Sequence, residues 1–106
     1  MSIPRLVADR SRQELVVGWS LQSDRTTLAK MFCDYSNTDL RDMIGAIRCP
    51  ALVLLESYFV NFKPAIERQF RALAPATLRY AGKGLHFIMY DDPEWYTAQV
   101  TSFIAQ

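Results

Sequence analysis

The fold is decided by the stretch Cys49-Pro50-Ala51-Leu52-Val53-Leu54-Leu55. Its last five residues are all apolar and follow a proline. A run of that length is typical of a strand that is covered on both faces of a parallel sheet. We therefore predict a central strand over residues 51–55, with further strands beside it.

The sequence after this strand predicts the rest of an α/β unit. Lys63-Pro64 opens a helix with proline at its favoured first position, and Pro75 ends it. Residues 77–81 predict a second, less apolar strand, and Asp92-Pro93 begins a final helix. The expected buried stripes of the two helices are Ile66, Phe70 and Leu73, and Trp95, Val100, Phe103 and Ile104. A strand–helix–strand unit with so short a connection is a right-handed parallel crossover, so the fold class is α/β.

The amino-terminal half is predicted to be helical. Ser11 and Glu14 match a capping box at the start of a helix over 11–21, and Ser23 or Asp24 caps a second helix. The apolar residues of the second helix are spaced by three and four, which places them on one stripe: Leu28, Met31, Phe32 and Tyr35. A short helical turn over 40–44 leads to Gly45.

Bulk properties limit the class of protein. The 106 residues suffice for one domain, half of them are apolar, and the formal charge is +1, so we expect no binding to nucleic acid and no membrane association. The first residues have no apolar segment like that of a signal peptide, which favours a cytoplasmic protein. Cys33 and Cys49 are the only cysteines, and we predict two reduced packing residues, with no metal site and no cofactor.

The second half of the chain resembles the carboxy-terminal part of α/β-hydrolases. The family's segment of the type D-L-x-x-x-x-x-I-x-C-P-x-L-V-L is matched from Asp39 to Leu54, and its glycine-rich turn with a histidine and an aromatic residue is matched by Gly82-Lys83-Gly84-Leu85-His86-Phe87. The resemblance implies a partial α/β-hydrolase-like fold in a single domain over 1–106. Residues 1–38 would be cap-like helices and residues 39–106 the carboxy-terminal segment of the fold.

The same resemblance implies that His86 descends from a catalytic base, but other parts of the family's site are absent. No G-x-S-x-G nucleophile elbow occurs in the sequence. Where relatives have a glycine and an aspartate after the late strand, this chain has Glu56 and Phe59. The usual acyl-enzyme route therefore lacks its nucleophile here.

The residues themselves leave several roles open. Glu56 and Ser57 follow the first strand, so they share a rim with His86 if the two strands are neighbours; a Ser57–His86 dyad and a Glu56 that orients His86 are the functional alternatives. Ordinary polar residues at a strand end are the structural alternative. Asp91-Asp92 are predicted to cap the last helix. Four aromatic residues are candidates for a substrate pocket, a core cover or an interface: Tyr58, Phe59, Phe62 and Phe87.

Two functional hypotheses follow. The first is a hydrolase-like protein that cleaves small-molecule esters or related bonds, with His86 as general base. The second is a catalytically inactive unit that associates with itself, because two parallel strands leave edges without partners. A homo-oligomer would complete the sheet or exchange helices.

Overall fold

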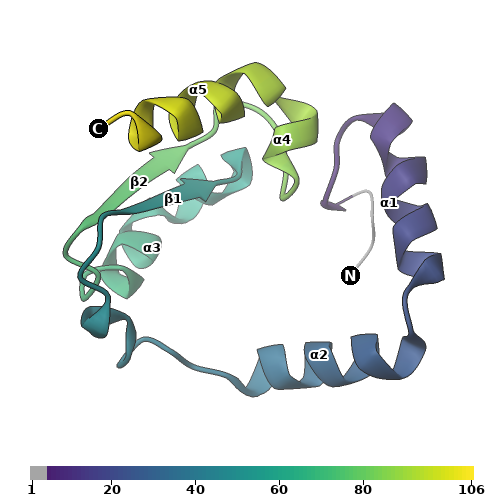
Figure 1. Cartoon of the computed structure of the whole chain (residues 1–106), viewed down its shortest axis with the longest axis horizontal. Coiled ribbons are helices and arrows are strands. Elements are labelled where there is room, and N and C mark those ends of the chain that lie inside the picture. The colour runs from purple at the N-terminus through teal and green to yellow at the C-terminus, as the bar shows by residue number, and fades with distance from the viewer. Residues whose placement is uncertain (1–4) are drawn as a thin grey trace.

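The structure, a computed structural model, describes residues 5–106. Figure 1 shows a two-helix arm beside an α/β half. The helices and strands are α1 (Arg10–Gln22), α2 (Arg25–Asn37), η2 (Ile44–Ala46), β1 (Ala51–Leu55), η3 (Ser57–Phe62), α3 (Lys63–Gln69), β2 (Ala76–Tyr80), α4 (Ile88–Asp91) and α5 (Pro93–Ile104).

The sheet is a parallel pair. β1 lies beside β2 with Ala51 opposite Ala76 and Leu55 opposite Tyr80. The parallel crossover and the position of β1 are confirmed, and β2 begins one residue earlier than predicted. The prediction of a central strand is wrong, because no third strand occurs in residues 5–106 and every residue of β1 is only half-buried. β1 therefore keeps one free edge within this chain.

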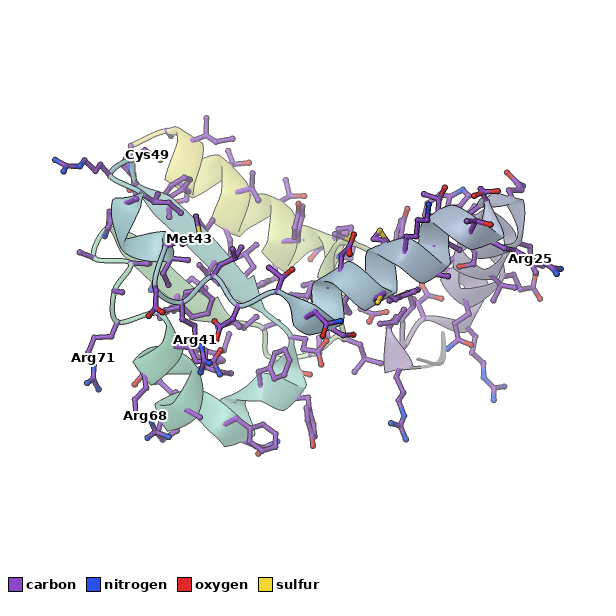
Figure 2. The ribbon with its side chains drawn as sticks, turned by 90° about the horizontal axis from the view of Figure 1, so that it is seen from below. Arg25, Arg41, Met43, Cys49, Arg68 and Arg71 are labelled. Atoms are coloured by element: carbon purple, nitrogen blue, oxygen red, sulfur yellow. The ribbon has the colours of Figure 1, made fainter. Side chains whose placement is uncertain are left out.

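The sheet is covered by α3 and α5, which lie on opposite sides of it (Figures 1 and 2). Pro64 and Pro93 stand in the first turns of these helices, as predicted, and the Asp92 side chain accepts a hydrogen bond from the Trp95 amide at 3.3 Å. Ile104 was predicted to face inward but is 75% exposed, because α5 ends at that residue. The short helix α4, which precedes α5, was not predicted.

Aspartates cap the two helices of the arm. α1 is capped by Asp9 and not by Ser11, because the Asp9 carboxylate accepts hydrogen bonds from both the amide and the hydroxyl of Ser11, at 2.9 and 2.6 Å. Asp24 caps α2 as predicted and accepts from the Thr27 amide and hydroxyl. These bonds, led by those from the Ser11 and Thr27 hydroxyls, hold the pKa of each aspartate below its ordinary value.

The arm packs little against the rest of the chain. α1 buries Val16, but no residue of α2 is buried. The apolar stripe of Leu28, Met31, Phe32 and Tyr35, called here the α2 stripe, lies on this helix, and its last three residues are 52%, 47% and 75% exposed. The five buried apolar residues in residues 5–106 are Val7, Val16, Leu73, Ala81 and Ile88. None of the helices in this range is long and apolar enough to cross a membrane.

Asp91 joins the arm to the α/β half. Its carboxylate accepts hydrogen bonds from the amides of Ala8 and Asp9, at 2.8 to 3.0 Å, and from the amide of Leu85 at 2.8 Å. Phe87 adds a backbone bond to the Leu6 carbonyl at 2.9 Å. The predicted capping role therefore belongs to Asp92 alone. Asp91 instead binds backbone amides from two parts of the chain that lie far from each other in the sequence.

The replacement Asp91→Asn should destabilise the fold. Both carboxylate oxygens of Asp91 accept backbone N–H groups, so an amide nitrogen in either position would face a donor. We expect a loss of about 2 kcal/mol in the free energy of unfolding, the usual size for hydrogen bonds to a charged group. Urea denaturation measures this loss, with Asp34→Asn on the exposed surface of α2 as control. Equal stability of the two variants would contradict the role of Asp91.

Candidate functional site

The candidate site lies where β1 and β2 end. The Ala81 amide donates to the Leu55 carbonyl at 2.9 Å, which extends the ladder past β2, and the Ser57 amide donates to the Gly84 carbonyl at 3.1 Å. The turn that carries His86 is therefore attached to the segment that follows β1. Glu56, Ser57 and His86 lie on one rim of the sheet, as the order of the strands predicts.

Ser57 is not joined to His86 by a hydrogen bond. Its hydroxyl donates to the Gly84 carbonyl at 2.7 Å, so both its amide and its side chain bind the same backbone oxygen. A hydroxyl held in this way fixes the turn before His86. The geometry of a Ser–His dyad, in which the hydroxyl donates to the imidazole, is not present.

His86 and Glu56 line a common pocket. The pocket has a volume of about 450 Å³, and its wall is largely apolar. The residues that line it are Arg5, Leu6, Met31, Phe32, Tyr35, Glu56, Phe59 and His86. The imidazole is exposed, and its ring and that of Phe87 meet in a T-shaped arrangement with 5.3 Å between the centroids. Solvent and a small molecule both have access to the imidazole, and a carboxylate lies in the same hollow.

The four predicted aromatic residues separate into different environments. Phe59 lines the His86 pocket. Tyr58 lines an adjoining hollow of about 480 Å³ with Arg5, Glu56 and Leu85, and its ring lies 5.3 Å from that of Phe62. Phe87 packs against Tyr90 with 6.3 Å between centroids. The structure therefore brings one of the four, Phe59, to the pocket that contains His86.

Several residues of the pocket were missed by the sequence analysis. Arg5 and Leu6 reach the pocket because the Asp91 carboxylate binds the amides of Ala8 and Asp9, which follow shortly after them in the sequence. The α2 stripe supplies Met31, Phe32 and Tyr35, which the sequence placed on one helical stripe but did not relate to a site. No local motif relates these residues to His86, because their proximity depends on contacts between segments far apart in the sequence.

Gly84 determines the path of the backbone into His86. It has φ of +96°, a value that side-chain-bearing residues rarely adopt, and a Cβ at this position would lie 2.9 Å from the Asp91 Cβ. The close approach lets the Asp91 carboxylate reach the Leu85 amide. The glycine, the aspartate and the histidine therefore form one local arrangement.

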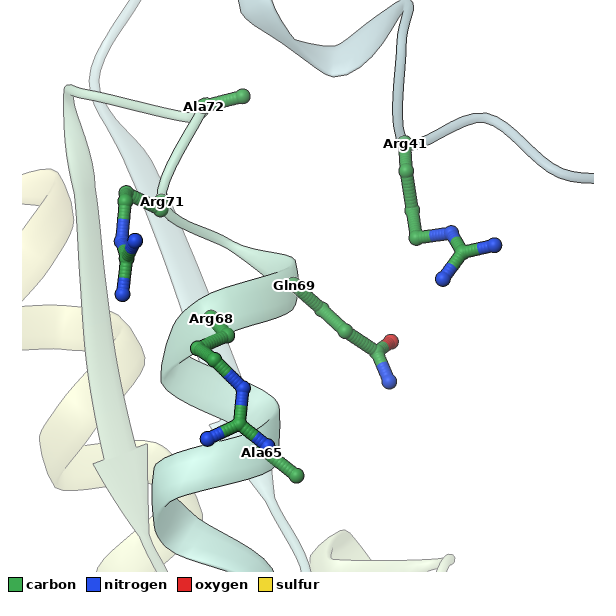
Figure 3. A pocket seen from close by; sticks show the side chains of 6 residues that line it. All are labelled: Arg41, Ala65, Arg68, Gln69, Arg71 and Ala72. Atoms are coloured by element: carbon green, nitrogen blue, oxygen red, sulfur yellow. The ribbon is translucent and has the colours of Figure 1, made fainter.

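A second pocket lies between the segment that joins α2 to η2 and the end of α3, and its charged side chains are basic. It has about 560 Å³ and is lined by Arg41, Ala65, Arg68, Gln69, Arg71 and Ala72. Figure 3 shows that the guanidinium groups of Arg41, Arg68 and Arg71 point in different directions and do not converge on one point. Arg41 is already paired with Asp39, whose pKa this contact lowers to about 2. The pocket contains none of the predicted site residues.

The two cysteines do not pack in the core. Cys33 and Cys49 are both exposed, so their prediction as packing residues is wrong; Cys33 lies on α2, none of whose residues is buried, and Cys49 lies in the exposed approach to β1. Within residues 5–106 no three His, Cys, Asp or Glu side chains are grouped as a metal site would require.

Comparison with known proteins gives no relative. A scan against protein-family models, a search of curated proteins and a search of solved structures found no match to this chain.

Two glycine replacements should have opposite effects. Gly84→Ala places a methyl group in a left-handed backbone conformation and against Asp91, so we expect a loss of about 1 to 3 kcal/mol in unfolding free energy. Gly18→Ala lies in α1 with no atom within 4 Å of the new Cβ, and should gain roughly 0.5 to 1 kcal/mol. Thermal denaturation of both variants checks the pair. A tolerated Gly84→Ala would contradict the described turn.

Proposed function

We propose that this chain carries the histidine-bearing part of an α/β-hydrolase-type site, with His86 as general base in the hydrolysis of a small ester or related bond. One observation carries the proposal: an exposed imidazole at the carboxyl ends of two parallel strands shares an apolar pocket with the Glu56 carboxylate. Active sites of open α/β sheets lie at this edge.

The hydrolase resemblance of the sequence supports the same reading. The matched segment from Asp39 to Leu54 ends in β1, and the matched turn from Gly82 to Phe87 follows β2 directly. The mixed helix and strand class agrees with such an origin, and residues 1–38 are helical over most of their described length. We propose on this basis that residues 39–106 correspond to the carboxy-terminal segment of that fold.

The pocket can hold the parts of a direct attack by water. The neutral His86 imidazole takes a proton from a water molecule while the water oxygen attacks the carbonyl carbon of the ester. The tetrahedral intermediate then expels the alcohol oxygen, which recovers that proton from the imidazolium. Glu56 in the same hollow would favour the positive charge that His86 gains, and Arg5 would favour the negative charge on the former carbonyl oxygen.

Direct attack by water is the route that this chain's residues support. The one serine at the rim, Ser57, has its hydroxyl bound to the Gly84 carbonyl, and the two cysteines lie outside the His86 pocket. Among residues 5–106, no serine or cysteine nucleophile lines the His86 pocket. Without one, we expect slow turnover of activated esters and no burst of acyl-enzyme formation.

The replacement His86→Ala should abolish most of this activity. We expect the chain to hydrolyse a p-nitrophenyl ester of a short acid, and the variant to lose roughly 10²-fold in rate, the usual contribution of a positioned general base. Release of p-nitrophenolate, followed by its absorbance, measures the rate. Glu56→Gln, which keeps the shape of the side chain, should lower the rate by a smaller factor.

Ser57→Ala distinguishes the two routes to hydrolysis. If water attacks directly, the variant retains the wild-type rate as long as circular dichroism shows an unchanged fold. A loss as large as that of His86→Ala, in a folded variant, would instead identify Ser57 as the nucleophile. An unchanged rate in His86→Ala would overturn the proposed function.

A further inference from the structure

The chain exposes more surface than a compact protein of its size. Its accessible surface is 8229 Å², whereas the scaling for compact monomers gives roughly 6,000 Å² at a mass of 12.2 kDa. The radius of gyration, 15.6 Å, likewise exceeds the value of about 13 Å expected for a compact chain of this length. The excess surface, roughly 2,000 Å², is large enough for the per-chain share of an obligate homodimer interface.

Part of the exposed surface is apolar and belongs to the arm. Large apolar side chains exposed on α1 and α2 include Leu15, Val17, Trp19, Leu21, Met31, Phe32 and Tyr35. Soluble monomers rarely expose contiguous apolar patches of more than a few hundred Å². Figure 1 shows that α2 runs beyond the edge of the α/β half and that no other helix of residues 5–106 lies along it.

The α2 stripe and Phe59 together form one apolar surface around the His86 pocket. Met31, Phe32, Tyr35 and Phe59 all line that pocket, although the first three come from the arm and the last from η3. α2 is amphipathic, because helical spacing places the polar residues Thr26, Lys30 and Asn37 on the face opposite the α2 stripe. A helix with one uncovered apolar face is typical of an interface element.

We propose that the α2 stripe and Phe59 form an interface with the same surface of a second copy of this chain. The chain exposes roughly 2,000 Å² more than a compact monomer of its mass, the α2 stripe and Phe59 supply part of this surface, and the formal charge of +1 gives two copies almost no mutual repulsion. A twofold axis needs only that one patch be complementary to itself, which an apolar helical stripe satisfies. The second copy would then cover the mouth of the His86 pocket, so its residues would form part of the pocket wall.

Light scattering coupled to size-exclusion chromatography tests the interface. The wild-type chain at micromolar concentration should have the mass of two copies of 12.2 kDa. Phe32→Glu places a charge in the centre of the stripe and should raise the dissociation constant by about thirtyfold or more, as loss of a central anchor does. Thr26→Glu adds the same charge to the opposite face of α2 and should leave the dimer mass unchanged. A wild-type chain with the mass of one copy would overturn the proposal.

Concentration dependence keeps the proposal testable if Phe32→Glu fails to fold. When association stabilises a fold, the midpoint of thermal unfolding rises with protein concentration. We expect this rise in the midpoint, measured by circular dichroism, for the wild-type chain and for Thr26→Glu. A midpoint independent of concentration would overturn the proposal, as would equal dissociation constants for Phe32→Glu and Thr26→Glu. Neither result depends on ester hydrolysis, so the interface and the proposed function are tested separately.

Discussion

The carboxylate of Asp91 holds together the parts of the chain that form the site. It binds the amides of Ala8 and Asp9 from the arm and the amide of Leu85 from the turn before His86. A carboxylate that accepts several backbone amides is a strong local constraint, since each bond involves a full charge. Without it, residues 5–9 would keep only the backbone bond from Phe87 to Leu6 as a hydrogen bond to the α/β half.

The same constraint explains how the catalytic proposal and the dimer proposal share one region. Asp91 places Leu6 and Arg5 beside His86, and the arm that follows them carries the α2 stripe to the other side of the pocket. One wall of the pocket is therefore the α2 stripe, whose lining residues remain exposed in the single chain. A second copy on this surface would exclude water from the imidazole and Glu56, and electrostatic interactions strengthen when water is excluded.

The sequence alone predicted the elements whose signals are local. The run 51–55 became β1, proline placed the starts of α3 and α5, and Asp24 and Asp92 cap their helices. Errors arose where a local pattern had two physical solutions. Asp9 competed with Ser11 for the cap of α1, and an apolar run of strand length is the same in sequence whether the strand lies in the centre or at the edge of a sheet.

The site was only partly predictable for a related reason. His86, Glu56 and Phe59 follow strands, and the order of parallel strands brings their carboxyl ends together whatever the loops do. Arg5 and the α2 stripe reach the pocket through the bonds of Asp91, which join residues more than eighty positions apart. No periodicity or motif encodes such a pairing in one sequence.

Amide hydrogen exchange tests the arrangement most directly. If Asp91 ties the arm to the His86 turn, the amide protons of Ala8, Asp9 and Leu85 exchange slowly and become exposed together in one opening event. Exchange of the Ala8 and Asp9 amides at the rate of a free peptide, while Leu55 and Ala81 stay protected, would contradict the account, because the arm would then be detached from the sheet that presents His86.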